Sequence, residues 1–532
     1  MNQKGIIGLL LPIRLIIAVI IVAVYLFQSP QIFKPKAAEQ ANSQEHIISK
    51  AIINSQPYLY NKSTGKIFIP RGNVYANTQQ VPDPWGGTST SGWEWFYPNY
   101  DKSKITQDLQ KMQTDGYNSI RVAVSPITIG SPSSQGLNIQ MLKNIADFLN
   151  TAKQHNIFVL LTVSLWPHSG GYAPASDPQD PLLDVGGGNF FYLSPKALET
   201  RKKYLRDLIN GLKQEGAPLD IIWAYDLDGE IAFSPNLKPF KNYQGQIITN
   251  AGNFSITGNT SKQEKEYIMN KNIIVYINTL TSTIKSVDPT ALVSVQMYPP
   301  ALQIPPGQEG NSDFERYVPA KWLVASPNVK EGDLSGVDTD LIALSMYPNT
   351  YGQNYQCQLS SLQIPGIGGD CNYPLRPGTN PKPIFVEEMG YVRNSGAQEN
   401  VLSASEAAPK IKNWMSLECS AGIRGWHMFT WNTLFNRNDG TSVSDYFTAI
   451  EDNEAINNAI KPTVWPNICG DDMDLILITG DTDGDNDIDI FDYNLVITDF
   501  GKTNDPNTKA DLDNDDDVDI FDYNFVVSNF GR

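Results

Sequence analysis

Short apolar segments alternate with amphipathic segments across residues 67–430, and this alternation constrains the fold more than any other feature of the sequence. Eight segments are apolar and short enough to be buried strands: residues 67–75, 119–124, 158–165, 220–227, 292–297, 341–346, 384–386 and 425–430. Segments with helical spacing separate several of them, at residues 105–114, 142–155, 195–214, 273–287 and 404–419. Hydrophobic strands alternating with helices indicate a parallel sheet covered by helices, and eight strands close a barrel more naturally than an open sheet. We therefore predict an α/β fold, a (β/α)8 barrel.

Carboxylates follow two of these strands. Residues 383–390 (PIFVEEMG) pass from an apolar strand into Glu387 and Glu388, and residues 221–230 (IIWAYDLDGE) also end in acids. The carboxyl ends of barrel strands form the active-site face, and two carboxylates at one rim are the minimum apparatus of glycoside hydrolysis. Because side chains alternate along a strand, we expect Glu387 to point away from Glu388 and to form a structural ion pair.

The charge of the chain is concentrated at its C-terminal end. The net charge is −17, and residues 471–532 alone carry 18 acidic and 3 basic side chains. The rest of the chain is nearly neutral and shows no basic patch. We therefore expect no nucleic-acid partner.

An internal repeat accounts for this acidity. Residues 481–494 (DTDGDNDIDIFDYN) return as residues 511–524 (DLDNDDDVDIFDYN). Acids at loop positions 1, 3, 5, 9 and 12, with a backbone carbonyl at position 7, match an EF-hand-type calcium loop, although position 6 is Asn486 or Asp516 in place of glycine. The sequence thus predicts two calcium ions. Their ligands are Asp481, Asp483, Asp485, Asp487, Asp489 and Asp492 in one loop, and Asp511, Asp513, Asp515, Asp517, Asp519 and Asp522 in the other.

The N-terminal segment is apolar from residue 5 to residue 27, interrupted only by polar Arg14. We interpret residues 1–33 as an uncleaved transmembrane signal anchor and residues 34–50 as a polar stalk, which places the remainder outside the cytoplasm. A cleaved signal peptide followed by secretion is the alternative. The further predicted boundaries are the barrel at 51–466, a linker at 467–479 and the repeats at 480–532.

The four cysteines lack the CxxC spacing of zinc or redox motifs. In an oxidising compartment Cys357 and Cys371 would close a short loop, and Cys419 and Cys469 would tie the last barrel unit to the end of the domain. Four unrelated thiols are the alternative.

Several motifs resemble clan A retaining glycoside hydrolases, most of all the family 5 cellulases and mannanases. They are FIPRGNVY, GYNSIRV, GNFFYLSPKAL, AYDLDGE, LSMYP, VEEMG and GWHMFTWN, at residues 68–75, 116–122, 188–198, 224–230, 344–348, 386–390 and 425–432. The resemblance implies a TIM barrel that hydrolyses β-linked glycans of the glucan or mannan type as an endo-β-glycanase.

The resemblance also implies roles for individual residues. Glu388 corresponds to the nucleophile and Glu230 to the general acid/base. The family's asparagine before the acid/base is Gly229 here, and Asp228 is a candidate to replace it. The other implied substrate-binding residues are Arg121, His168, Tyr347 and Trp431.

The C-terminal repeat resembles a type I dockerin, which implies docking onto a cohesin-type protein through Ile490, Phe491, Ile520 and Phe521 at loop positions 10 and 11. We therefore expect a membrane-anchored extracytoplasmic hydrolase that acts on a polysaccharide or oligosaccharide and carries a calcium-dependent docking module. Two alternatives remain. One is a barrel that binds glycans without cleaving them because of Gly229, and the other is a cell-surface assembly component in which docking is the main role.

Overall fold

The structure is a computed structural model of the whole chain, which divides into residues 1–44 and residues 45–532. It describes residues 45–53, 56–76, 81–82, 88–89, 96, 100–124, 136–163, 170–174, 180–182, 189–227, 229, 231, 237–241, 243–297, 337–348, 382–392, 403–420, 422–432, 447–469, 480–483, 488–503, 508–512 and 517–531. The predicted anchor lies outside these residues. Among the residues that are described, no helix has the length and apolar character needed to cross a membrane.

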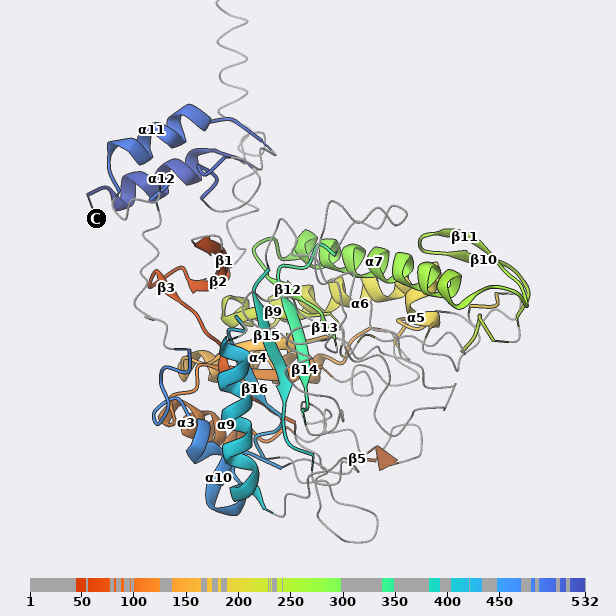
Figure 1. Cartoon of the computed structure of the whole chain (residues 1–532), viewed down its shortest axis with the longest axis horizontal. Helices are drawn as coiled ribbons and strands as arrows, with labels where there is room; N and C mark the ends of the chain where they lie inside the picture. The colour runs from red at the N-terminus through yellow and green to blue at the C-terminus, as the bar shows by residue number, and fades with distance from the viewer. Residues whose placement is uncertain are drawn as a thin grey trace, which may run out of the picture. The chain divides into compact units, whose positions relative to one another are not determined.

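A parallel sheet forms the centre of the main domain (Figure 1). Its hydrogen-bonded order is β12-β9-β8-β7-β4-β16-β15-β14-β13, and every neighbouring pair is parallel. The strands are β4 (Arg71–Val74), β7 (Ser119–Ala123), β8 (Phe158–Thr162), β9 (Ile222–Asp226), β12 (Val293–Ser294), β13 (Gln296–Met297), β14 (Ile342–Met346), β15 (Ile384–Met389) and β16 (Trp426–Met428).

The sheet closes into a barrel through residues 293–297. Only Val295 separates β12 from β13; β12 pairs with β9 while β13 pairs with β14, so the two act as one interrupted strand. The barrel therefore has eight strands in chain order, as predicted, and the α/β barrel is confirmed.

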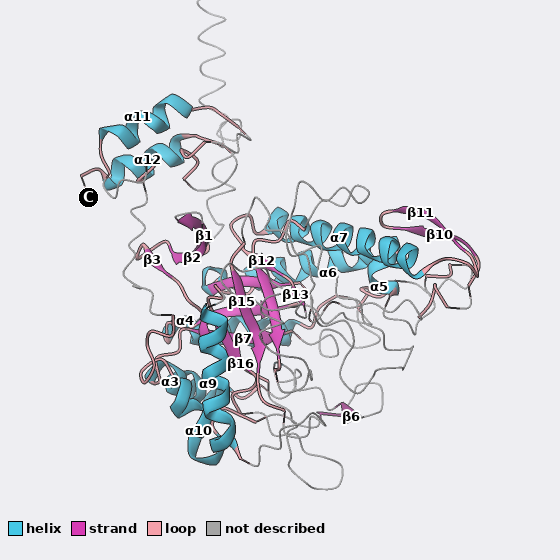
Figure 2. Cartoon of the chain, in the orientation of Figure 1, coloured by secondary structure: helices cyan, strands magenta, loops and turns pink. Residues whose placement is uncertain are grey.

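Helices surround the strands (Figure 2). They are α3 (Lys102–Thr114), α4 (Ile139–Gln154), α5 (Phe190–Leu193), α6 (Pro195–Gln214), α7 (Lys262–Val287), α9 (Ala404–Ser420) and α10 (Glu451–Ile460). Side-chain caps fix several of their starts: Ser194 caps α6, and Ser261 and Glu264 form a capping box at α7. Because of that box, α7 begins well before residue 273, where the sequence predicted it.

Two short antiparallel strand pairs and a 3-10 turn lie outside the barrel sheet. Between β9 and α7 lie β10 (Gly245–Thr249) and β11 (Gly252–Ile256), which pair antiparallel. A further antiparallel pair is β5 (Val81–Pro82) with β6 (Thr88–Ser89), and a single 3-10 turn, η2 (Leu219–Ile221), precedes β9.

An N-terminal sheet closes the end of the barrel opposite the carboxyl ends of the strands. It contains β1 (Ile48–Ile53), β2 (Gln56–Asn61) and β3 (Lys66–Ile67), all antiparallel. Side chains of this segment pack into the barrel interior with strand residues, in a cluster of Ile48, Leu59, Phe68, Leu160, Trp223, Ala224, Leu292, Leu341, Ala343 and Phe385. The packing stabilises both parts because it removes apolar surface from water.

The start of this sheet corrects one predicted boundary. Residues 45–50 were assigned to the polar stalk, but His46 and Ile48 are fully buried. The ring nitrogens of His46 lie 2.6 Å from the Ile222 carbonyl oxygen and 3.0 Å from Asp288 Oδ2. Residues 45–50 therefore belong to the barrel.

A disulfide joins Cys419, at the end of α9, to Cys469, after α10. The segment that it anchors is also held by Arg71, which donates to the carbonyl oxygens of Ile460 at 2.6 Å and Trp465 at 3.2 Å. One of the two predicted cysteine pairings is thus present. Cys357 and Cys371 lie outside the described residues.

The C-terminal repeats form a small unit with its own core. Its helices are α11 (Ile490–Asp499) and α12 (Ile520–Asn529), which pack against each other (Figure 1). A capping box starts each helix, made by Asp489 with Asp492 and by Asp519 with Asp522. The core between them contains Ile488, Val496, Ala510, Val518 and Val526.

Candidate active site

Glu388 lies near the C-terminal end of β15, where the carboxyl ends of the barrel strands meet. Its Oε1 accepts a hydrogen bond from Arg121 Nη1, and its Oε2 accepts one from the Tyr347 hydroxyl at 2.9 Å. The side chain is 13% exposed. Two donors, from β7 and from the residue after β14, thus fix both carboxylate oxygens, and a small part of the side chain stays exposed.

Arg121 is the centre of the polar network. Its Nε lies 3.0 Å from Thr162 Oγ1 and 2.5 Å from Glu387 Oε1. Its Nη2 lies 3.3 Å from Gln296 Oε1 and 3.8 Å from Asp226 Oδ2. Burial disfavours its charge, but the surrounding carboxylates outweigh burial and raise its pKa above the ordinary value. The guanidinium is therefore a fixed cation among carboxylates.

The position of Glu387 corrects the expectation from strand alternation. Both Glu387 and Glu388 contact Arg121, so their side chains do not point to opposite sides of β15. The register of β15 shifts at this point: Val386 pairs with Leu344, but Glu388 pairs with Ser345. A bulge of this kind places two successive side chains on one side of the strand. The predicted ion pair of Glu387 is present.

A second polar group lies inside the barrel beside Arg121. His427 Nε2 is 2.8 Å from Ser119 Oγ, which also accepts a hydrogen bond from Trp223 Nε1 at 3.0 Å. Burial, helped by the charge of Arg121, lowers the pKa of His427 to about 3. This histidine is therefore neutral, and it is surrounded by aromatic rings.

Trp431 is in a different environment from the one its predicted role requires. Its side chain is completely buried, its Nε1 donates to Asp108 Oδ1 at 3.2 Å, and its ring meets Tyr117 edge to face. Tyr75 also donates to Asp108, at 2.6 Å. In this arrangement Trp431 exposes no part of its ring to a substrate, so the substrate contact predicted for it is not supported.

Three other predicted residues, Glu230, Asp228 and His168, lie outside the described residues, and their roles remain predictions. Thr162, Asp226 and Gln296 also belong to this polar network but were not predicted from the sequence. All three are buried polar residues in or beside apolar strand segments, and this pattern was the available signal.

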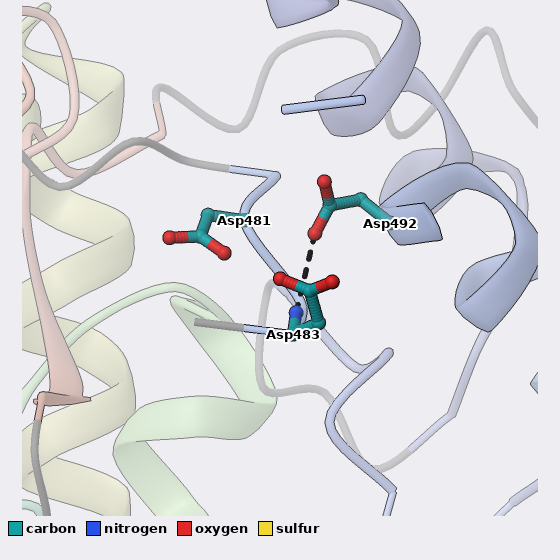
Figure 3. A group of neighbouring side chains, drawn as sticks. All are labelled: Asp481, Asp483 and Asp492. Carbon is teal, nitrogen blue, oxygen red and sulfur yellow. Dashed lines mark hydrogen bonds between the residues drawn. The ribbon is translucent and has the colours of Figure 1, made fainter. Parts of the chain in front are cut away.

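The acidic loops bring together the carboxylates expected of a calcium site. In the first loop, one carboxylate oxygen each from Asp481, Asp483 and Asp492 lies within 4.8 Å of the others (Figure 3). Asp492 accepts the backbone N–H groups of Thr482 at 2.6 Å and Asp489 at 2.8 Å. Burial opposes ionisation, but these hydrogen bonds lower the pKa of Asp492. Asp492 therefore offers an ionised oxygen of the kind that calcium prefers.

The second loop forms a comparable group from Asp517, Asp519 and Asp522. The sequence assigned Asp517 a backbone carbonyl ligand, whereas here its side chain also belongs to the group. Two predicted ligands, Asp489 of the first loop and Asp511 of the second, are described but do not belong to these groups. The remaining predicted ligands lie outside the described residues: Asp485, Asp487, Asp513 and Asp515.

No family model matches the chain, and no curated protein matches it by sequence. Its fold is similar to solved structures of glycoside hydrolases. An exo-β-1,4-mannosidase from Opitutaceae bacterium strain TAV5 has a TM-score of 0.45 and 15% identity, covering 79% of this chain and 61% of that one. A β-mannanase from the blue mussel Mytilus edulis has a TM-score of 0.41 and 17% identity, covering 79% and 96%. An endo-1,4-β-D-mannanase from Thermotoga petrophila RKU-1 has a TM-score of 0.43 and 16% identity, covering 74% and 99%.

Proposed function

We propose that this protein is a retaining glycoside hydrolase that cleaves β-linked glycans of the glucan or mannan type. The observation that supports this most directly is the position of Glu388, held by Arg121 and Tyr347 at the carboxyl ends of the barrel strands. A carboxylate with both oxygens fixed and a partly open face suits in-line attack on an anomeric carbon.

The proposed mechanism is double displacement. Glu388 attacks the anomeric carbon while Glu230 protonates the leaving oxygen, which gives a covalent glycosyl-enzyme. Water then attacks this intermediate, with Glu230 as the general base, and Glu388 is released. Arg121 orients the nucleophile through a charge-assisted hydrogen bond, and Tyr347 holds the other oxygen.

A panel of β-glucans, mannans and xylans tests this proposal. We expect one polymer to be cleaved, and expect Glu388→Gln and Glu230→Gln each to lower the rate on the order of a thousandfold. Glu199→Gln is the matched control, because the Glu199 side chain is 65% exposed on α6 and its ion-pair partner among the described residues is Lys202. If the native chain binds a polymer without cleaving it, the proposal is wrong and the non-catalytic glycan-binding barrel replaces it.

We also propose that the C-terminal unit binds two calcium ions and docks onto a cohesin-type protein. The exposed apolar residues at equivalent positions of its two repeats support this: Ile490 and Phe491 are 50% and 62% exposed, and Ile520 and Phe521 are 50% and 60% exposed. Exposed apolar patches mark interaction surfaces. Calorimetric titration of the chelator-treated chain with Ca²⁺ tests the metal sites, and binding of a type I cohesin with and without Ca²⁺ tests docking.

We further propose an extracytoplasmic location with membrane anchoring through residues 1–33. The Cys419–Cys469 disulfide supports an oxidising compartment. Fractionation of the intact chain and of a version lacking residues 1–33 tests the anchor: only the intact chain should sediment with membranes. Recovery of both in the soluble fraction would favour the cleaved signal.

A further inference from the structure

Three carboxyl groups surround one guanidinium inside the barrel. Glu387 and Asp226 are completely buried, Glu388 is nearly so, and Arg121 lies between them with its side chain 3% exposed. If all three acids were ionised, the cluster would hold a charge of −2 in a site with little water. Burying unbalanced charge is costly, so such clusters retain protons.

The hydrogen bonds show where a proton fits. Glu387 Oε1 accepts from Thr162 Oγ1 at 3.3 Å and lies 2.5 Å from Arg121 Nε. Its buried Oε2 receives no hydrogen bond from a donor in the described part of the chain, and its carboxyl group lies within hydrogen-bonding reach of the carboxyl group of Asp226. Ionised carboxylates only accept hydrogen bonds, so a bond between two carboxyl groups requires a proton on one of them.

We propose that Asp226 and Glu387 share one proton at neutral pH, and that this carboxyl pair is a positioning group for Glu388. With the proton in place, the cluster carries a charge of −1, and the Nη1 edge of Arg121 remains available to Glu388. Without the proton, a further negative charge would compete for the same guanidinium. The first half of the proposal stands on the cluster alone, and the second half rests on the hydrolase function proposed above.

The other groups around Glu387 do not supply the missing charge. Among described residues, Thr162 on β8, Gln296 on β13 and Ser345 on β14 are uncharged, and Gln296 donates to Ser345 Oγ at 2.8 Å. His427 on β16 is neutral, as its lowered pKa requires. Burial also raises the pKa of Glu387; Arg121 and the hydrogen bond with Asp226 oppose this rise, and the proximity of Glu388 adds to it, so that the pKa stays above its ordinary value. The pair titrates as one unit.

Infrared spectroscopy of the intact chain tests the shared proton without any assay of hydrolysis. Exposed acids are ionised at pH 7, whereas other protonated carboxyl groups, the proposed general acid Glu230 among them, give a carbonyl stretch in every variant; difference spectra therefore isolate the contribution of this pair. We expect a band in the native chain and an unchanged band in Glu199→Gln, and the loss of one component of it in both Glu387→Gln and Asp226→Asn. Each of these two variants keeps the cluster at −1 with a neutral amide in place of the protonated acid. Absence of the band from the native chain, or an unchanged band in Glu387→Gln, overturns the proposal, and the first of these results needs no variant to fold.

The pH profile of hydrolysis tests the positioning role. If Glu387 were ionised, Glu387→Gln would remove a negative charge beside Glu388 and move the acid limb of kcat/KM down by about one pH unit or more. Because we infer that the pair holds a proton, we expect that limb to move by less than about 0.3 pH units, whatever the change in rate. A larger shift shows that Glu387 is ionised beside Glu388 and overturns both the shared proton and the positioning role that depends on it. Absence of all hydrolysis by the native chain refutes the hydrolase proposal and the positioning role together, while the infrared band still decides the shared proton.

Discussion

Opening the Cys419–Cys469 disulfide should lower the free energy of unfolding by about 4 kcal/mol. The two cysteines are separated by 50 positions in sequence, and the loop-entropy relation for a closed loop of that length gives about 4 kcal/mol at 25 °C. The effect acts mainly on the unfolded chain. The folded segment should stay in place, because Arg71 still bonds the carbonyl oxygens of Ile460 and Trp465.

Urea unfolding of Cys419→Ala, Cys469→Ala and the double variant, followed by tryptophan fluorescence, measures this loss. Each single variant already opens the loop, so all three should be destabilised by nearly the same amount. The single variants also serve as controls for the small volume change at each site, since Cys419 is 5% exposed. A strictly additive pattern, or a loss below about 1 kcal/mol in the double variant, would contradict the entropic account.

Three further predictions concern the barrel. Burial lowers the pKa of Lys382 from 10.5 to about 8, so the folded chain loses this proton at a lower pH than the unfolded chain does. The free energy of unfolding should therefore rise between those two pH values, by up to about 1.4 kcal/mol per pH unit. Lys382→Met should flatten that rise in urea titrations. His46→Ala removes one hydrogen-bond partner of the buried Asp288 carboxylate and should lower the free energy of unfolding in urea by about 3 kcal/mol. Adding Asp288→Asn should restore part of this loss. An unchanged urea midpoint in His46→Ala would show that the contact contributes nothing to stability. In Gly72→Ala the new Cβ would lie 2.0 Å from the Ser119 carbonyl oxygen, so β4 must separate from β7; we expect a loss of more than about 3 kcal/mol, and native-like thermal unfolding would disprove the close approach.

The sequence was sufficient to predict the barrel and the order of its strands, because apolar periodicity is a local property of the chain. It also located the acidic loops, since ligand spacing is read directly along a loop. Arg121, Tyr347 and Glu388 were named from their motifs, and the structure brings them into contact. Their chemical roles remain predictions.

Only the tertiary structure decided which side chains share one environment. Arg121 and Glu388 are 267 positions apart, and their contact depends on the register across strands that the local pattern does not encode. The bulge in β15 places the Glu387 side chain on the side of the strand that faces Arg121. Tertiary packing buries both Trp431 and His46. Burial and strand register are properties of the assembled barrel. The charge balance within the site therefore follows from the fold and not from any one segment of the sequence. The proton inferred for Asp226 and Glu387 is part of that balance.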